Sequence, residues 1–264
     1  MARRLQFALI AAACAHAATP ARGTVEYVRT IPSVKEFTKS HSVFTKVFDW
    51  LVGPADGKPE VLRPYATTRD SAGRLFVADP GQHGVHVYDF EKHKYQFLKG
   101  PRGKTMDSPI DLACDASDNL YVTDSVRARI YVFDTKGKFR RTIEGGFLRP
   151  TGMALDRRAQ RIYVADTLRH QVIMLTFDGK ELGTIGRRGA AQGEFNFPTA
   201  LTLASGKLYV VDAMNFRIQS FTIDGRFVSS FGQLGNQSGT LSRPKGIAAD
   251  SDGNIYVVYA MFET

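Results

Sequence analysis

The chain has 264 residues, of which 43% are hydrophobic and 23% are charged, and its formal net charge is +9. These proportions are ordinary for a globular protein and exclude a disordered chain. Lysine and arginine are scattered along the sequence rather than massed in one block. The charge therefore favours a solvated basic surface over a dedicated nucleic-acid or membrane site.

The first 17 residues have the features of a secretory signal peptide. Arg3 and Arg4 precede an apolar stretch at residues 5–13, and Ala15-His16-Ala17 provides a cleavage site. The apolar stretch is much shorter than the roughly 20 residues that a membrane-spanning helix needs. We therefore favour export, to the periplasm or the cell exterior, over a buried N-terminal helix.

Cys14 offers a second way of processing the same segment. Ala11-Ala12-Ala13-Cys14 also fits a bacterial lipoprotein site, in which Cys14 becomes the lipidated first residue and the only contact with a membrane. Cleavage after Ala17 would instead leave Cys114 as the single cysteine, which excludes an intramolecular disulfide. Both routes remain open, and the inner-strand position of Cys114 predicts a buried, inert thiol.

An N-terminal segment at residues 18–61 follows, with a strand predicted at 25–31, and beyond it one pattern repeats. Each copy opens on a proline and small residues and continues into an apolar strand. The copies span 64–98, 109–143, 150–185, 198–231 and, cut short, 244–264, with strands RLFVAD, NLYVTD, RIYVAD, KLYVVD and NIYVVY. A period of about 41 to 48 residues suits one four-stranded propeller blade, and helical periodicity is missing. The sequence thus predicts one all-β domain at 62–264, a propeller of four-stranded antiparallel blades.

The third repeat can be divided into four strands, predicted at 151–156, 161–166, 172–177 and 180–185. Asp178-Gly179 predicts the hairpin turn between the last two, since glycine accepts the positive φ that such turns need. The first repeat has Glu91-Lys92-His93 at this place, which predicts a looser turn.

Two stretches resemble the NHL-repeat family of β-propellers. They are VADTLRHQVIML and VVDAMNFRIQSF, together with the Pro-x-Gly openings PTGMALD at Pro150 and PKGIAAD at Pro244. The resemblance covers roughly residues 62–264, and it implies a six-bladed ring. The chain accounts for about four and a half blades, so we expect a propeller that is incomplete at its C-terminus. In the fifth repeat Tyr259 stands where the other four have aspartate.

The four repeated aspartates admit two interpretations. A ring of carboxylates could bind a cation, but we favour a structural role, in which each side chain accepts backbone N–H bonds from the loop after its strand. These residues are Asp79, Asp124, Asp166 and Asp212. Arg129 and Arg217 hold equivalent places and are expected to pair with these acids or with a neighbouring blade. The histidines, among them His83, His86, His93 and His170, are expected to be exposed loop residues, and no metal or cofactor is predicted.

The loops at the proline end of the channel vary between repeats, which is what a binding face on a repeated frame would show. We expect an acidic or sugar-like ligand to be bound there, by Arg63, Tyr65, Asp111, Arg149, Thr151, Thr199, Arg243 and Lys245. No nucleophile elbow, phosphate loop or HExxH motif is present. The sequence therefore favours an exported, non-catalytic binding or scaffold module for a protein, peptide or glycan. The alternatives are a lyase or hydrolase with a channel site and, against the evidence for export, RNA binding.

Overall fold

The computed structural model describes residues 30, 34–37, 59–235, 237 and 239–259. The chain divides into two units, residues 1–60 and residues 61–264. In the first unit the described structure is a short helix, α1 (Val34–Phe37). The predicted signal peptide, Cys14 and all of the predicted strand at 25–31 except Thr30 lie outside the described residues. None of the described helices is long and apolar enough to cross a membrane.

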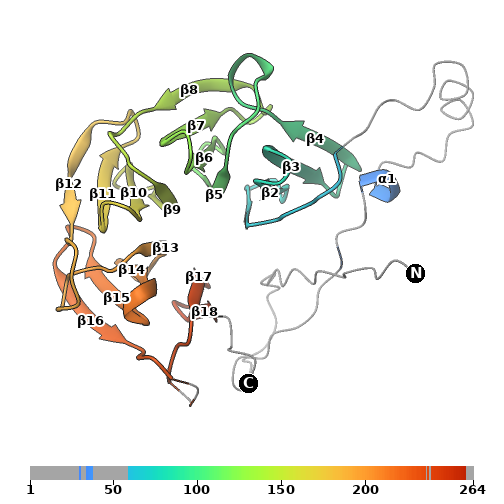
Figure 1. Ribbon diagram of the computed structural model, residues 1–264. Coiled ribbons are helices and arrows are strands. Elements are labelled where there is room, and N and C mark those ends of the chain that lie inside the picture. Colours follow the sequence, from blue (N-terminus) through green and yellow to red (C-terminus); the bar gives the residue numbers. More distant parts are fainter. Residues whose placement is uncertain (1–29, 31–33, 38–58, 236, 238, 260–264) are drawn as a thin grey trace, which may run out of the picture. The chain divides into compact units, whose positions relative to one another are not determined.

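The second unit is built from antiparallel sheets, each made of strands that are consecutive in the chain (Figure 1). Four sheets have four strands and the fifth has two. Blade 1 is β1 (Ala66–Arg69), β2 (Leu75–Asp79), β3 (Gly84–Asp89) and β4 (Lys94–Leu98), and blade 2 is β5 (Pro109–Cys114), β6 (Leu120–Asp124), β7 (Arg129–Phe133) and β8 (Phe139–Ile143). Blade 3 is β9 (Pro150–Asp156), β10 (Arg161–Asp166), β11 (Gln171–Thr176) and β12 (Glu181–Ile185), and blade 4 is β13 (Pro198–Ala204), β14 (Lys207–Asp212), β15 (Arg217–Thr222) and β16 (Phe227–Phe231). The half blade is β17 (Pro244–Ala249) and β18 (Ile255–Tyr259).

The prediction of an all-β propeller with about four and a half blades is thereby confirmed. In the third repeat the predicted strands match β9 to β12 to within one residue at each end. Gly179 has a φ of +96°, as its hairpin turn requires. In the first repeat four residues join β3 and β4, and the turn closes with His93 at a φ of +49°.

Strand register explains why the repeat is marked by a proline and an aspartate. Pro109 pairs with Asp124, Pro150 with Asp166, and Pro198 with Asp212, and after each pair the register shifts. In the half blade Pro244 pairs with Tyr259. An inner strand therefore begins where the next strand ends. Since the third strand starts at the same end, the interblade links and the loops between second and third strands gather at one end of the propeller.

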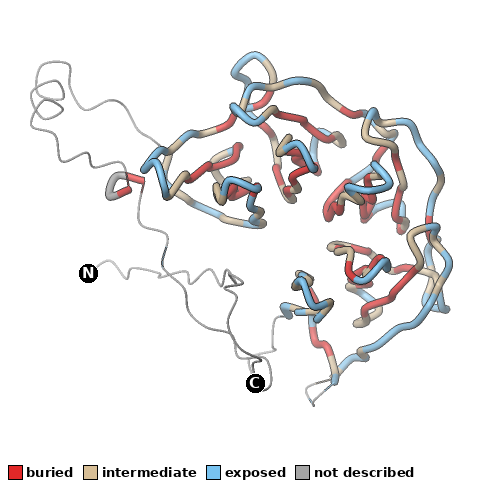
Figure 2. The backbone as a smooth tube through the Cα atoms, turned by 180° about the vertical axis from the view of Figure 1, so that it is seen from behind, coloured by how far each residue is buried: buried red, intermediate tan, exposed pale blue. Residues whose placement is uncertain are grey.

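The hydrophobic core lies between neighbouring blades rather than inside any one sheet. The inner strands β1, β5, β9, β13 and β17 lie beside one another in that order. Each space between two blades is filled by apolar side chains from both, as where Phe76 and Val87 of blade 1 share a cluster with Leu112 and Tyr131 of blade 2. Figure 2 shows the resulting pattern, with buried segments inside the blades and exposed ones at their turns.

Candidate binding face

Each repeated aspartate is a fully buried acceptor that ties two loops together. Asp166 accepts backbone N–H bonds from Leu148 and Arg149, at 2.7 and 3.0 Å, and from Arg169 at 3.2 Å. Asp124 likewise accepts from both the preceding link and its own following loop. The four carboxylates are enclosed and accept loop N–H groups, and Asp79 and Asp212 also accept side-chain donors. This is the structural role, and it fixes the backbone of the loops at the proline end.

The two equivalent arginines behave differently. Arg217 Nε lies 2.9 Å from Asp212 Oδ2, so it pairs with the acid of its own blade. Arg129 pairs instead with Glu144, at 3.3 Å, and its Nε–H donates to the carbonyl oxygen of Arg127. Arg129 therefore faces the outer side of blade 2 and lies away from the buried carboxylate.

The expectation that the histidines are exposed loop residues is wrong for two of them. His86 lies on β3, is fully buried, and places Nε2 3.2 Å from Asp79 Oδ2. His170 is also buried, and its Nδ1 accepts the Phe197 N–H at 3.2 Å. Alternation along GVHVYD places His86 on the face of β3 opposite Val85 and Val87, which pack against blade 2. His83 and His93 are exposed.

Five exposed apolar side chains lie in the loops at the proline end. Leu62 and Leu148 stand two residues before the marker prolines, and Val126, Leu168 and Met214 stand two residues after the marker aspartates. Each of these five is between 48 and 66% exposed. Monomeric proteins seldom leave apolar side chains clustered on one face unless that face has a partner.

Arginines alternate with these apolar residues. Arg63 and Arg149 follow Leu62 and Leu148, and Arg169 follows Leu168. All three are exposed, and the ion pairs among the described residues include none of them. We define the Pro face by these residues together with three further exposed side chains at the same end, Tyr65, Arg243 and Lys245. The set is Leu62, Arg63, Tyr65, Val126, Leu148, Arg149, Leu168, Arg169, Met214, Arg243 and Lys245.

Five of the eight residues predicted to bind a ligand belong to the Pro face: Arg63, Tyr65, Arg149, Arg243 and Lys245. The other three lie on inner strands and do not present their polar groups there. Thr151 is buried, and its Oγ1 lies 2.8 Å from both Thr167 Oγ1 and the carbonyl oxygen of Thr199. The hydroxyl of Thr199 is enclosed and has no hydrogen-bond partner among the described residues.

Asp111 is the third, and it links two adjacent blades. Its Oδ2 accepts the Met153 N–H of β9 at 2.7 Å, and its Oδ1 accepts the Leu112 N–H at 2.8 Å. Burial raises the pKa of this carboxyl to about 7, although both hydrogen bonds act in the opposite direction. Asp111 therefore acts as a strut between inner strands and changes charge near neutral pH.

The sequence reasoning missed the apolar half of the Pro face. The signal was available: an apolar residue two positions after the marker aspartate recurs in three repeats, inside a loop where polar residues are usual. Among the described residues no group of three or more His, Cys, Asp and Glu side chains is placed to hold a metal ion.

Two family models match parts of the chain. One is described as a 6-bladed beta-propeller and matches residues 107–185, and the other is described as a beta-propeller repeat and matches residues 231–258. A search of the curated proteins gave no significant match.

Solved structures with the same fold include enzymes and a binding protein. Virginiamycin B lyase from Staphylococcus aureus is 18% identical with a TM-score of 0.59, and the match covers 75% of this chain and 63% of the lyase chain. A gluconolactonase from Xanthomonas campestris is 17% identical with a TM-score of 0.56, covering 73 and 68% of the two chains. A chain of a nidogen/laminin complex is 20% identical with a TM-score of 0.59, covering 76 and 75%. The chain thus spans less than two thirds of the lyase, and at these identities the likeness establishes the β-propeller fold alone.

Proposed function

We propose that this chain is an NHL-type propeller that acts as a non-catalytic binding module and holds an acidic segment of a protein or peptide on its Pro face. The observation that carries the proposal is that exposed apolar side chains alternate with Arg63, Arg149 and Arg169, which take part in none of the ion pairs of the described residues. Arginine and methionine are enriched at protein interfaces, and an acidic partner complements the positive charge.

The choice of a protein over RNA follows from the apolar side chains. RNA recognition relies on aromatic residues that stack on bases, and Tyr65 is the one aromatic side chain of the Pro face. Leu62, Leu148, Leu168 and Met214 offer flexible apolar contacts that suit the apolar side chains of an acidic peptide. Arg63, Arg149 and Arg169 then provide the charge that orients it.

A peptide library displayed on phage and selected against the immobilised full chain tests this proposal. We expect the enriched peptides to combine Asp or Glu with apolar residues. The triple variant Arg63→Glu, Arg149→Glu and Arg169→Glu should lose them. Matched control variants at the opposite end, Lys136→Glu and Arg158→Glu, should retain them, because these exposed cations lie in turns far from the marker prolines.

Two results would contradict the proposal. One is the selection of peptides without acidic residues that bind the triple variant and the parent equally. The other is preferential binding of homopolymeric RNA with an affinity that falls steeply with salt.

We also propose that the module is exported, on the basis of residues 1–17. Expression of the full chain in a bacterium, followed by mass spectrometry of the mature N-terminus, tests this. A start at Ala18 indicates a soluble exported protein and a lipid-modified Cys14 indicates an anchored one. An unprocessed N-terminus in the cytoplasmic fraction would contradict export.

A further inference from the structure

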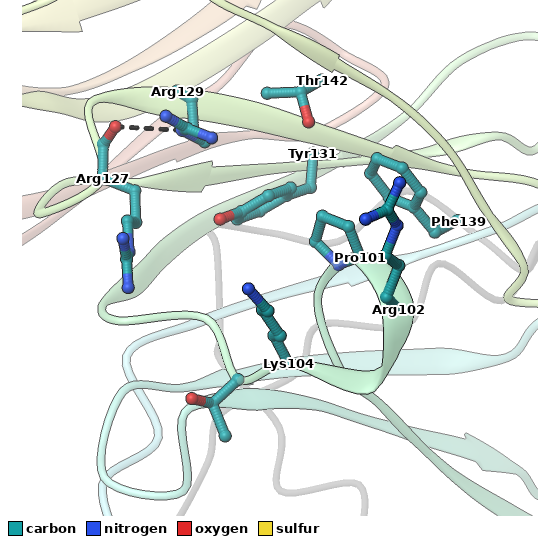
Figure 3. A pocket seen from close by; sticks show the side chains of 9 residues that line it. Pro101, Arg102, Lys104, Arg127, Arg129, Tyr131, Phe139 and Thr142 are labelled. Atoms are coloured by element: carbon teal, nitrogen blue, oxygen red, sulfur yellow. Dashed lines mark hydrogen bonds between the residues drawn. The ribbon is translucent and has the colours of Figure 1, made fainter.

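A pocket of about 470 Å³ lies on the outer part of blade 2, where the link after β4 passes over strands β7 and β8 (Figure 3). Its charged lining comes from Arg102 and Lys104 on the link and from Arg127 and Arg129 at the start of β7. The half-buried Phe139 supplies an aromatic surface, and the buried Tyr131 packs against it. The volume lies within the range of roughly 300–1,000 Å³ that is usual for small-molecule sites.

The pocket carries more positive than negative charge. Arg127 pairs with Asp107 at 2.7 Å, and Arg129 pairs with Glu144 at 3.3 Å. Arg102 and Lys104 take part in none of the ion pairs that the described residues form. Both are exposed at the mouth of the pocket, so two cations remain for an incoming anion.

The link that carries Arg102 and Lys104 is held in place. The buried Met106 donates its N–H to the carbonyl oxygen of His83, and His83 Nδ1 lies 2.9 Å from the carbonyl oxygen of Asp107. The Lys104 N–H donates to Pro101 O at 3.1 Å, which closes a tight turn. Arg102 has a φ of +53°, a backbone conformation that costs free energy in a residue with a side chain. The cations are thus presented from a fixed turn.

The aromatic surface is equally fixed. Tyr131 is 3% exposed, and its ring centroid lies 6.3 Å from that of Phe139 in an edge-to-face arrangement. In Figure 3 the Tyr131 side chain lies at the centre of the pocket, with Arg127 and Arg129 to one side and Pro101 and Arg102 to the other. An inorganic anion would contact the cations and leave this apolar surface unused.

We propose that this pocket binds an anionic monosaccharide, a sugar ring that carries a carboxylate or phosphate group. The anionic group would bind Arg102 and Lys104, because charge-assisted hydrogen bonds are the strongest available there. The apolar face of the ring would lie against Phe139 and Pro101, which are both half-buried. Because the mouth of the pocket is open to water, the hydroxyl groups of the sugar stay hydrated, which suits a sugar better than a fully apolar ring.

Isothermal titration of the full chain with four probes tests the site: glucuronate, glucose 6-phosphate, glucose and inorganic phosphate. We expect one or both anionic sugars to bind, and glucose and phosphate to bind at least about tenfold more weakly, since each lacks half of the contacts. The two anionic probes distinguish a carboxylate ligand from a phosphate ligand. Equal binding of glucose and its anionic derivatives, or of phosphate and glucose 6-phosphate, would overturn the proposal.

Three variants complete the test. Arg102→Ala and Lys104→Ala remove exposed side chains and should each weaken binding about tenfold. Lys138→Ala, which removes an exposed lysine from the turn between β7 and β8, should leave the affinity unchanged. Unchanged affinity in both link variants would refute the site. The triple Pro face variant should bind the sugars as the parent does, so failure of the proposed function and failure of this site can be told apart.

Discussion

His86 and Asp79 form a fully buried pair in blade 1, with His86 Nε2 3.2 Å from Asp79 Oδ2. At the equivalent place in blade 4, Gln219 Nε2 lies 3.2 Å from Asp212 Oδ2. In both blades the marker aspartate thus receives a side-chain donor from the same place on the third strand, a histidine in blade 1 and a glutamine in blade 4, where Arg217 donates as well.

The replacement His86→Gln should therefore be tolerated, whereas His86→Leu should not. Leucine removes one of the two donors to the buried Asp79 Oδ2 and leaves the Leu62 N–H as the other, and loss of this hydrogen bond to a charged group costs about 1–3 kcal/mol of unfolding free energy. Urea titrations of the two variants at pH 7.5 check this difference. Equal loss of stability in both variants would mean that His86 acts through its volume alone.

The same histidine should make stability fall on acidification. Burial lowers the pKa of His86 from its usual 6.5, although Asp79 raises it. The neutral ring accepts the Tyr95 hydroxyl at Nδ1, 2.9 Å away, and donates from Nε2. The unfolded chain binds the proton more tightly, so this contribution is complete above about pH 6.5 and is lost as the pH falls toward the folded-state pKa. In His86→Gln this acid-dependent loss of stability should be absent. If His86→Gln still loses stability over the same pH range, another group is responsible.

Titration of Asp111 should change the free energy of unfolding with pH in the opposite direction to titration of His86. Its folded-state pKa is raised from 3.8 to about 7, so the folded protein holds the proton more tightly than the unfolded chain does. Stability from this group should fall as the pH rises from about 4 to about 7, by at most about 1.4 kcal/mol per pH unit. Because His86 titrates in the same window, the measurement belongs in the His86→Gln background.

In that background Asp111→Asn should flatten the pH dependence of the free energy of unfolding. Asp252→Asn, a change in an exposed turn, provides the control and should leave the dependence in place. If the slope between pH 4 and 7 survives in Asp111→Asn, the carboxyl titrates nearer its usual pKa than its burial indicates.

The fold could be predicted from the sequence because the marker proline and the marker aspartate stand at fixed places in the full repeats. A proline that opens the inner strand and an aspartate that ends the next one are paired in the register, as Pro150 and Asp166 are, so their spacing reports the blade itself. His86 was misplaced although its strand was predicted. All the histidines were expected in exposed loops, whereas His86 is the third residue of β3, a strand that is buried on both faces.

The pocket on blade 2 was beyond the reach of the repeat. It depends on Arg102 and Lys104, which lie on a link with no counterpart of the same sequence in other blades, and on Tyr131 of the following blade. Repeat analysis compares equivalent positions, whereas this site joins positions that are not equivalent. Thr151 and Asp111 were predicted to bind a ligand and instead have internal roles for a similar reason. Neighbouring inner strands lie so close that the polar groups of these residues form hydrogen bonds with the next strand.

That closeness gives a prediction at Gly152. A Cβ at this position would lie 2.6 Å from both Ala200 Cα and the carbonyl oxygen of Thr199, which belong to the next inner strand. Gly246 holds the same place after its marker proline, and a Cβ there would meet Val258 Cβ at 3.9 Å, an ordinary contact. The two glycines are alike in sequence and differ in what surrounds them.

Gly152→Ala should lower the free energy of unfolding by about 1–3 kcal/mol, because backbone atoms of β13 cannot move aside without loss of the packing between blades 3 and 4. Gly246→Ala should leave stability unchanged or raise it by up to about 1 kcal/mol, since alanine restricts the unfolded chain. Urea titration of both variants under the same conditions decides the matter. Equal effects would mean that glycine is required by the backbone conformation of the motif, and a loss confined to Gly152→Ala would show that it is required by the crowding of inner strands.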